Sequence, residues 1–333
     1  MHNVLITGVA GFLGSHLANY LLKENYNIVG VDNLISGDLE NVNKKIKFYD
    51  FDCQDFKNLN KIMKNIDYVF HCASTAHEGL SVFSPVENSK NNIVATTSVV
   101  ASAVNNKVKK IIYCSSMARY GSQKIPFTED MKPKPTDPYG IFKVAGEEIL
   151  KNLCNLNKVD WVIAVPHNII GPNQKYDDPY RNVISIFLNR MLQKKPPIIY
   201  GDGNQKRCFS YIDDCIVPLY KMLNKKITNQ IINIGPDEEY VTINKAAEIC
   251  SNISGSNLKP IYVLERPQEI KEAHCSSDKA RKLLGYQTKT SFYNAVKKTY
   301  EHIKKRGSKK FKYYLQIEIN NKITPLTWKK KII

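Results

Sequence analysis

The chain has 333 residues, of which 43% are hydrophobic, and it carries a formal net charge of +17 at pH 7. No apolar run reaches the roughly 18 residues that a membrane span needs, and no secretory signal is expected. The lysines are spread along the chain without a nucleic-acid-binding motif, so neither a membrane nor a nucleic acid is expected as a partner. The eight cysteines show no paired spacing, which predicts reduced thiols, a cytoplasmic location and no metal site.

Short apolar runs alternate with amphipathic stretches over the first part of the chain. Such alternation predicts a parallel sheet covered by helices on both faces, the doubly wound α/β architecture. The expected strands cover residues 3–7, 27–31, 45–50, 67–71, 110–115 and 161–165. The pattern predicts a first domain of residues 1–170, and its regularity fades beyond residue 171.

Residues 171–333 are predicted to form mostly a smaller second α/β domain, with a segment of about 210–235 returning to the first. Two polar stretches, GPNQKYDDPYRN and PPIIYGDGNQKR, are interpreted as loops of this second domain. Helices are expected at 183–193, 212–223, 243–253 and 292–305, and strands at 231–235 and 260–264. The basic segment KKRGSKKFK at 304–312 is interpreted as a solvated surface.

The stretch TGVAGFLGSH, residues 7–16, follows the first expected strand and opens the first helix. Its glycines, Gly8, Gly11 and Gly14, permit a tight turn, close approach of the backbone to a pyrophosphate, and close helix packing. Asp32 ends the second strand, 18 residues after Gly14, where a carboxylate can accept hydrogen bonds from an adenosine ribose. Because this carboxylate would repel a 2'-phosphate, the predicted cofactor is NAD rather than NADP.

Tyr139 and Lys143 lie four residues apart at the start of a helical pattern, so their side chains share one face. This helix follows the strand that ends in Ser115 and Ser116. A lysine ammonium beside a phenol is expected to lower the pKa of the tyrosine toward the working pH. Tyr139 is therefore the candidate acid and base, and Lys143 is its partner.

Three motifs, TGxxGxxG at 7–14, SSxxxYG at 115–121 and YxxxK at 139–143, together resemble those of the extended short-chain dehydrogenase/reductase family. The chain is similar to its nucleotide-sugar epimerase and dehydratase branch, and closest to the 4-epimerases of UDP-glucose or UDP-N-acetylglucosamine. The resemblance covers about nine tenths of the chain. It implies a Rossmann-like NAD-binding domain, a smaller C-terminal α/β domain that binds a nucleotide sugar, and a homodimer joined through the helices at 91–104 and 139–156.

The resemblance also implies roles for single residues. Ser116 would hydrogen-bond the reacting sugar oxygen, Tyr139 would be the acid and base, and Lys143 would also bind the nicotinamide ribose. The implied cofactor contacts are Gly8, Gly11, Phe12, Leu13, Gly14, Asp32, Asn33, Asp52, Cys53, Ala73, Ser74, Asn92, Tyr139, Lys143 and Pro166. The implied substrate contacts are Thr75, Ser81, Ser116, Asn168, Asn182, Val183, Tyr200, Arg207, Arg266 and Ala273. The two arginines suit a diphosphate because guanidinium groups bind oxyanions in a bidentate manner.

The residues after Ser116 restrict the chemistry that the resemblance implies. Similar 4,6-dehydratases carry an Asp-Glu pair there, whereas this chain has Met117 and Ala118, which cannot ionise. The leading hypothesis is therefore NAD-dependent epimerisation at C4 of a UDP-hexose or UDP-N-acetylhexosamine. A sugar-nucleotide 4-dehydrogenase or reductase that releases its keto product would use the same residues and is an alternative. A non-catalytic NAD-binding scaffold is a third reading, which the intact Ser116, Tyr139 and Lys143 oppose.

Further expectations concern single side chains near the proposed cleft. Ala273, seven residues after Arg266, stands where the similar 4-epimerases have a residue that walls the sugar pocket, so its small size predicts room for a 2-acetamido group. His71 ends an apolar strand and is expected to be a core residue. His77 and His167 have no acidic partner at a recognisable spacing, so neither is assigned an acid or base role.

Overall fold

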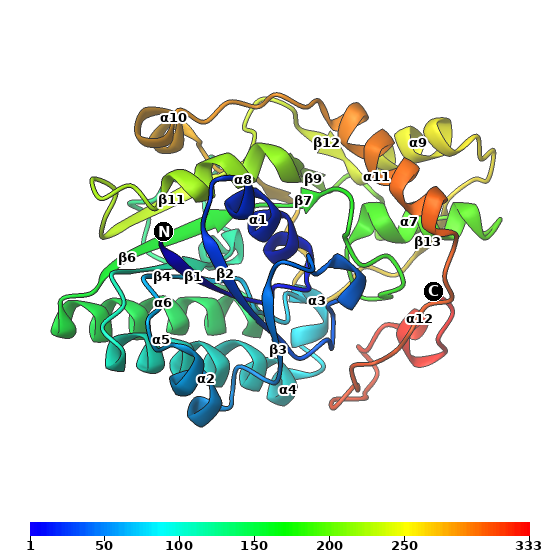
Figure 1. Cartoon of the computed structure of the whole chain (residues 1–333). Helices are drawn as coiled ribbons and strands as arrows, with labels where there is room; N and C mark the ends of the chain where they lie inside the picture. Colours follow the sequence, from blue (N-terminus) through cyan, green and yellow to red (C-terminus); the bar gives the residue numbers. More distant parts are fainter.

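The computed structural model describes all 333 residues, and a seven-stranded parallel sheet forms its centre (Figure 1). In chain order its strands are β1 (Asn3–Thr7), β2 (Asn27–Asp32), β3 (Lys47–Asp50), β4 (Tyr68–His71), β5 (Lys110–Cys114), β6 (Asp160–Pro166) and β11 (Gln230–Ile234). The order across the sheet is β11-β6-β5-β4-β1-β2-β3, which confirms the predicted Rossmann-like fold. The strand order reverses between β1 and β4, where such sheets bind ligands at the strands' carboxyl ends.

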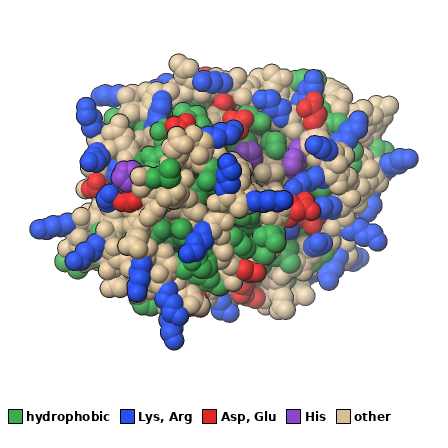
Figure 2. Space-filling model, in the orientation of Figure 1, with side chains coloured by type: hydrophobic (Ala, Val, Ile, Leu, Met, Phe, Trp, Pro, Cys, Tyr) green, Lys and Arg blue, Asp and Glu red, His purple; other side chains and the backbone are tan.

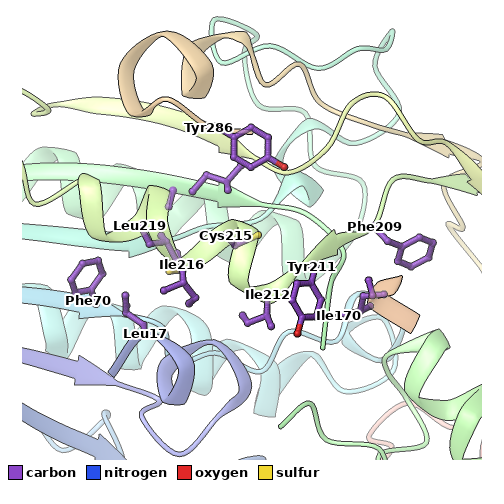
Figure 3. Close-up of a cluster of buried hydrophobic side chains, with 14 of the residues drawn as sticks. Leu17, Phe70, Ile170, Phe209, Tyr211, Ile212, Cys215, Ile216, Leu219 and Tyr286 are labelled. Carbon is purple, nitrogen blue, oxygen red and sulfur yellow. The ribbon is translucent and has the colours of Figure 1, made fainter. Parts of the chain in front are cut away.

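Helices cover both faces of this sheet (Figure 1). One face carries α1 (Phe12–Lys23) and α8 (Ile212–Lys221), and the other carries α2 (Phe56–Ile62), α5 (Ala95–Asn105) and α6 (Pro138–Asn157). The strands are continuous apolar runs because both faces are buried, as in β5, where every residue is buried. On the α1 face, Leu17, Phe70 and Ile216 lie in one hydrophobic cluster that joins α1, β4 and α8 (Figure 3).

The segment near residues 210–235 lies against the first part of the chain. Strand β11 pairs in parallel with β6, from Gln230 beside Val162 to Ile234 beside Pro166. Helix α8 packs on α1. These contacts place α8 and β11 in the layers of the large sheet, although the residues on either side of them belong to the smaller unit.

A smaller α/β unit stands beside the carboxyl ends of the large sheet (Figure 1). Its main helices, which pack on one another, are α7 (Val183–Leu192), α9 (Ile243–Ser254) and α11 (Phe292–Arg306). Its short strands form three small sheets: β8 (Ile198–Tyr200) with β13 (Ile261–Val263), β9 (Lys206–Arg207) with β12 (Val241–Thr242) and β14 (Glu272–Ala273), and β7 (Ile169–Ile170) with β10 (Ser210–Tyr211). The remaining helices are α3 (Glu78–Ser81), α4 (Pro85–Ser89), α10 (Asp278–Leu284), α12 (Leu326–Lys329), the 3-10 turns at Leu39–Asn41 and Met117–Tyr120, and the π-helical turn at Lys90–Val94.

The interpretation of PPIIYGDGNQKR as a loop is wrong in part, because this stretch holds β8 and β9. Both strands have only two or three residues, which is too short to show an alternating pattern. They exist because partners distant in sequence supply their hydrogen bonds: β13 lies beside β8, and β12 and β14 flank β9.

The tail of residues 309–333 runs from the end of α11 along one side of the smaller unit (Figure 1), and it contacts the segment after β4. The indole of Trp328 is buried and packs edge-on against the rings of Phe83 and Tyr180. The carboxylate of Glu318 accepts hydrogen bonds from two backbone amides at the start of α4. The tail is therefore a packed part of the protein, anchored to both units.

The surface is rich in basic side chains. In Figure 2 the lysines and arginines are scattered over the face in view and interspersed with acidic groups. Of the helices, none combines the length and the apolar character that crossing a membrane requires.

Candidate active site

A cavity of about 440 Å³ opens at the carboxyl ends of the strands and extends under the smaller unit. Its walls include residues of the glycine turn after β1, the ends of β2, β4, β5 and β6, the start of α6, and parts of β8 and β9. It thus occupies the place where the strand order reverses, and it is the deep cavity that brings the predicted cofactor and substrate residues together.

The turn between β1 and α1 gives the cavity an anion-binding end. Gly8 has φ +70°, and a Cβ there would lie 2.8 Å from the backbone nitrogen of Ala73. Gly11 is the N-cap of α1, so the free amide groups of the first helical turn face a ligand at this point. Next to the turn, the buried carboxylate of Asp32 accepts hydrogen bonds from the amides of Ala10 (2.9 Å) and Leu34 (2.8 Å). A pyrophosphate beside the glycines and a ribose beside Asp32 fit these donors and acceptors.

Replacing Gly14 by alanine is expected to weaken NAD binding about tenfold or more and to destabilise the protein by about 1–3 kcal/mol. A Cβ on Gly14 would overlap the carbonyl oxygen of Gly8 and lie 3.0 Å from Cα of Val9, so the turn must move. Fluorescence titration with NAD and thermal unfolding measure the two effects. In the control Gly255→Ala, at a position with no heavy atom within 4 Å, the NAD affinity should stay within about twofold. An unchanged NAD affinity in Gly14→Ala would contradict the assigned role of the turn.

Most of the implied cofactor contacts line the cavity. They are Gly8, Gly11, Phe12, Leu13, Gly14, Asp32, Asn33, Asp52, Cys53, Ala73, Ser74, Tyr139, Lys143 and Pro166. Asn92 does not line it: the Asn92 side chain is buried behind the wall, where its Oδ1 accepts a hydrogen bond from Ser74 Oγ at 2.6 Å. Its amide nitrogen also donates to the carbonyl of Thr75. Asn92 therefore positions two wall residues and makes no contact with the cavity itself.

The start of α6 presents the candidate acid and base. Asp137 caps the helix by accepting a hydrogen bond from the amide of Gly140 at 2.9 Å, and Tyr139 and Lys143 follow on the face toward the cavity. Lys143 Nζ donates to the carbonyl oxygen of Cys114 at 2.9 Å and lies 5.8 Å from the centre of the Tyr139 ring. Ser116, at the end of β5, lines the same part of the cavity. The three implied catalytic side chains therefore converge.

The expected lowering of the Tyr139 pKa is wrong for the ligand-free protein. Burial raises the pKa of Tyr139 above its ordinary value, and the carboxylate of Glu78 adds to the rise. The Arg181 guanidinium and the hydroxyl of Ser116 oppose this shift. Burial also lowers the pKa of Lys143 to about 8. The sequence placed the lysine correctly beside the tyrosine, but it could not show how much water the fold removes from both groups.

A buried ion pair behind Ser116 supports this site. The guanidinium of Arg119 binds the carboxylate of Glu147 in a bidentate manner, with Nε–Oε1 and Nη2–Oε2 distances of 3.0 Å. Ser115 Oγ donates a further hydrogen bond to Glu147. Both charged side chains are almost fully buried. The pair joins the turn after β5 to α6, and so it fixes Ser116 relative to Tyr139 and Lys143. Its partners are 28 residues apart in the sequence, and no local pattern points to either of them.

The substrate end of the cavity contains most of the implied substrate contacts. Those that line it are Thr75, Ser116, Asn168, Asn182, Val183, Tyr200, Arg207 and Arg266. The Arg266 guanidinium lies 4.7 Å from the centre of the Tyr200 ring and pairs with Glu269 at 2.7 Å. Arg207 lies on β9, with Glu269 3.7 Å away. The two arginines thus share one carboxylate, and an entering diphosphate would compete with it.

Two of the implied substrate residues lie outside the cavity wall. Ser81 is fully buried, and its Oγ accepts a hydrogen bond from the amide of Tyr139 at 3.1 Å. Ala273 lies on β14, is 3% exposed and packs in the core cluster that also holds Phe127 and Cys275. Ala273 therefore lies outside the cavity lining, beside Arg207 on β9, and room for a 2-acetamido group stays a prediction.

His71 is confirmed as a core histidine. Its ring nitrogens hydrogen-bond the hydroxyls of Thr7 (2.7 Å) and Thr96 (2.9 Å), and burial lowers the pKa of His71 to about 3. His77 differs from the expectation, because its Nε2 lies 2.7 Å from the carboxylate of Asp178. The tail residue Tyr314 donates to the same carboxylate at 2.7 Å. These partners are far apart in the sequence, so no spacing rule could pair them.

Comparison with known proteins agrees with this geometry. Residues 4–235, from β1 through β11, match the NAD dependent epimerase/dehydratase family. The chain therefore belongs to this family. The resemblance identified from the three motifs and the predicted class of NAD-dependent enzyme are thus confirmed.

Similar proteins span nearly the same length as this family member. A putative UDP-glucose 4-epimerase of Methanocaldococcus jannaschii is 33% identical over 306 residues, which cover 90% of this chain and 98% of the relative. The structure of UDP-glucose 4-epimerase with UDP-glucose from Thermotoga maritima has a TM-score of 0.87 at 31% identity, covering 91% of this chain and 99% of that one. UDP-glucuronic acid 4-epimerase from Bacillus cereus, in complex with UDP-glucuronic acid and NAD, has a TM-score of 0.85 at 30% identity and the same coverage.

Proposed function

We propose that this family member epimerises C4 of a UDP-hexose or UDP-N-acetylhexosamine, with NAD as cofactor. The observation that carries the proposal is that Ser116, Tyr139 and Lys143 line the same cavity as the glycine turn and the pair Arg207 and Arg266. One cavity thus combines an end suited to a dinucleotide, an end suited to a diphosphate, and a proton-transferring tyrosine between them. The similar solved enzymes, which are 4-epimerases of UDP-sugars, support this assignment.

Tyr139 would hold and move the proton of the C4 hydroxyl. NAD, when bound, supplies a two-electron acceptor that is restored at the end of the cycle, and a positive ring charge beside the phenol. The Tyr139 oxygen takes the hydroxyl proton as C4 is oxidised and returns it after the 4-keto sugar has turned its other face. Ser116 donates a hydrogen bond to the sugar oxygen, and the Lys143 ammonium stabilises the phenolate. Met117 and Ala118 are buried and apolar, so this turn offers no acid for eliminating the C6 hydroxyl.

Incubating the purified protein with UDP-glucose, and separately with UDP-N-acetylglucosamine, tests the proposal. Separation of the sugar isomers should show the C4 epimer without added NAD and without accumulation of reduced nicotinamide absorbance, because no net redox change occurs. Product formation that requires stoichiometric external NAD would support the dehydrogenase reading. The absence of turnover and of NAD binding would contradict the proposal.

We also propose that two copies of the chain associate through α5 and α6. Apolar side chains are exposed along this region: Val94 (45%), Ile141 (51%) and Leu156 (77%). Ile141→Glu is expected to weaken the dimer about tenfold or more, because it places a charge within the buried interface. Light scattering over a concentration series measures this, with Leu264→Glu, an exposed residue of the smaller unit, as the control. A wild-type protein that is monomeric throughout would contradict the proposal.

A reducing, cytoplasmic setting is part of the same proposal. All eight cysteines are free thiols, and seven of them are buried. When the protein is purified without a reductant and then denatured, a thiol assay should therefore detect eight free thiols per chain.

A further inference from the structure

The loop after β4 places Glu78 in the substrate end of the cavity. Glu78 begins α3, whose last residue, Ser81, accepts a hydrogen bond from the amide of Tyr139 at 3.1 Å. On the other side, a Cβ on Gly79 would lie 3.4 Å from Nη1 of Arg266. The helix therefore spans the distance between the proton-transferring tyrosine and a guanidinium suited to the diphosphate. A hexose whose C4 lies at Tyr139 and whose diphosphate lies at Arg266 must therefore extend along this helix, beside Glu78.

Among the carboxylates that line the cavity, Glu78 is the one without a partner. Asp32 and Asp52 accept backbone or amide hydrogen bonds, Asp178 pairs with His77, and Glu269 pairs with Arg266. The Glu78 side chain makes no hydrogen bond or ion pair within the protein and is exposed to the cavity. A carboxylate without a partner in a cavity is stabilised by a ligand that donates hydrogen bonds to it, and it repels a second anion.

We propose that Glu78 selects the sugar: its carboxylate accepts hydrogen bonds from the hydroxyls of a neutral hexose and disfavours a uronate. The proposal rests on the proposed function, because it requires a UDP-sugar in this cavity. It distinguishes between the substrates named for two similar enzymes, UDP-glucose and UDP-glucuronic acid, whose sugars differ in a carboxylate at C6. It also adds a specificity residue that lines the cavity, which Ala273 does not.

The surroundings of Glu78 make this discrimination depend on pH. The Glu78 side chain is exposed to the cavity, and its partial removal from water, together with the nearby Asp137 carboxylate, raises the pKa of Glu78 to about 7. The charged and titratable groups that face it are Asp137, Tyr139, Arg207, Arg266 and Glu269. Glu78 is thus negatively charged above about pH 7 and becomes neutral below it, while a uronate remains anionic throughout. Discrimination against the uronate should therefore be strong near pH 8 and weaker near pH 6.

Calorimetric binding to the NAD-loaded full-length protein tests the proposal without relying on turnover. The measured quantity is the ratio of the Kd for UDP-glucuronate to the Kd for UDP-glucose. Near pH 8, Glu78→Gln should lower this ratio about tenfold, because the amide keeps the size of the side chain and removes its charge. Glu265 precedes Arg266 in the sequence but does not line the cavity. Glu265→Gln removes the same charge as Glu78→Gln, and it should leave the ratio within about twofold of the wild-type ratio.

The outcomes separate the two proposals. If wild-type protein binds none of UDP-glucose, UDP-N-acetylglucosamine and UDP-glucuronate, the proposed function itself fails. If it binds both UDP-glucose and UDP-glucuronate and the ratio in Glu78→Gln stays within about twofold of the wild-type ratio, the role of Glu78 is overturned while the proposed function stands. If the ratio falls as much in Glu265→Gln as in Glu78→Gln, the role of Glu78 is also overturned, because the effect would then come from the net charge of the protein. The wild-type ratio at about pH 6 and 8 gives a test free of any substitution: no change between them would contradict the charge of Glu78 as the cause.

Discussion

Tyr139→Phe is expected to lower kcat about 100- to 10,000-fold while the KM for the UDP-sugar changes less than about threefold. The phenol lines the cavity together with Ser116 and Lys143, and the ring of phenylalanine fills the same space without a proton to transfer. Binding depends on the glycine turn and on the arginines, which this change leaves in place. Initial rates measured by isomer separation over a range of UDP-sugar concentrations give both constants.

Tyr113→Phe is the matched control for that experiment. The Tyr113 hydroxyl is buried without a hydrogen-bond partner, and the residue does not line the cavity. Its loss should therefore change kcat by no more than about threefold. A Tyr139→Phe protein that keeps more than about a tenth of the wild-type kcat would show that another group moves the proton.

Glu147→Gln is expected to lower the free energy of unfolding by about 3–5 kcal/mol. The change leaves the guanidinium of Arg119 buried without a counter-charge, since Glu147 is its bidentate partner. Both side chains are at most 2% exposed, so water cannot take over the role of the carboxylate. Urea denaturation without ligand measures the loss, because bound NAD would itself stabilise the folded state.

The neighbouring residue provides a strict comparison for Glu147. Glu148 carries the same side chain on the same helix but is 62% exposed, and it pairs with Lys151 at the surface. Glu148→Gln should cost less than about 1 kcal/mol. If the two variants lose similar amounts of unfolding free energy, the Arg119–Glu147 pair contributes no more to stability than a surface pair. The double variant Arg119→Met, Glu147→Met should recover part of the loss, because it removes both buried charges.

Local patterns were sufficient to predict the layers and to single out Ser116, Tyr139 and Lys143, which the fold brings together at one cavity. Strands that are buried on both faces have continuous apolar sequences. The ranges expected for β1, β2, β4, β5 and β6 therefore lie close to those in the structure. The glycine turn and the four-residue spacing of Tyr139 and Lys143 are also local features. Each requires a particular residue type at a short separation, and each is therefore visible in the sequence alone.

Errors arose where a property depends on contacts between distant segments. The strands β8 and β9 exist only through partners more than 30 residues away along the chain, and the Asp178 partner of His77 is 101 residues away. The direction of the Tyr139 pKa shift follows from burial, which results from the packing of the whole molecule. No local pattern of residues in the sequence reports such properties.

The residue types, their periodicity and the three-motif resemblance were therefore enough to predict a doubly wound NAD-dependent enzyme, and the family match confirmed this class. In the folded chain Ser81, Asn92 and Ala273 lie outside the cavity lining, whereas Glu78, Asp178 and Glu269 lie in it. The reason is geometric. A periodic pattern reports which way a side chain points from its own helix or strand, whereas a binding site consists of several elements whose relative positions are set by long-range packing.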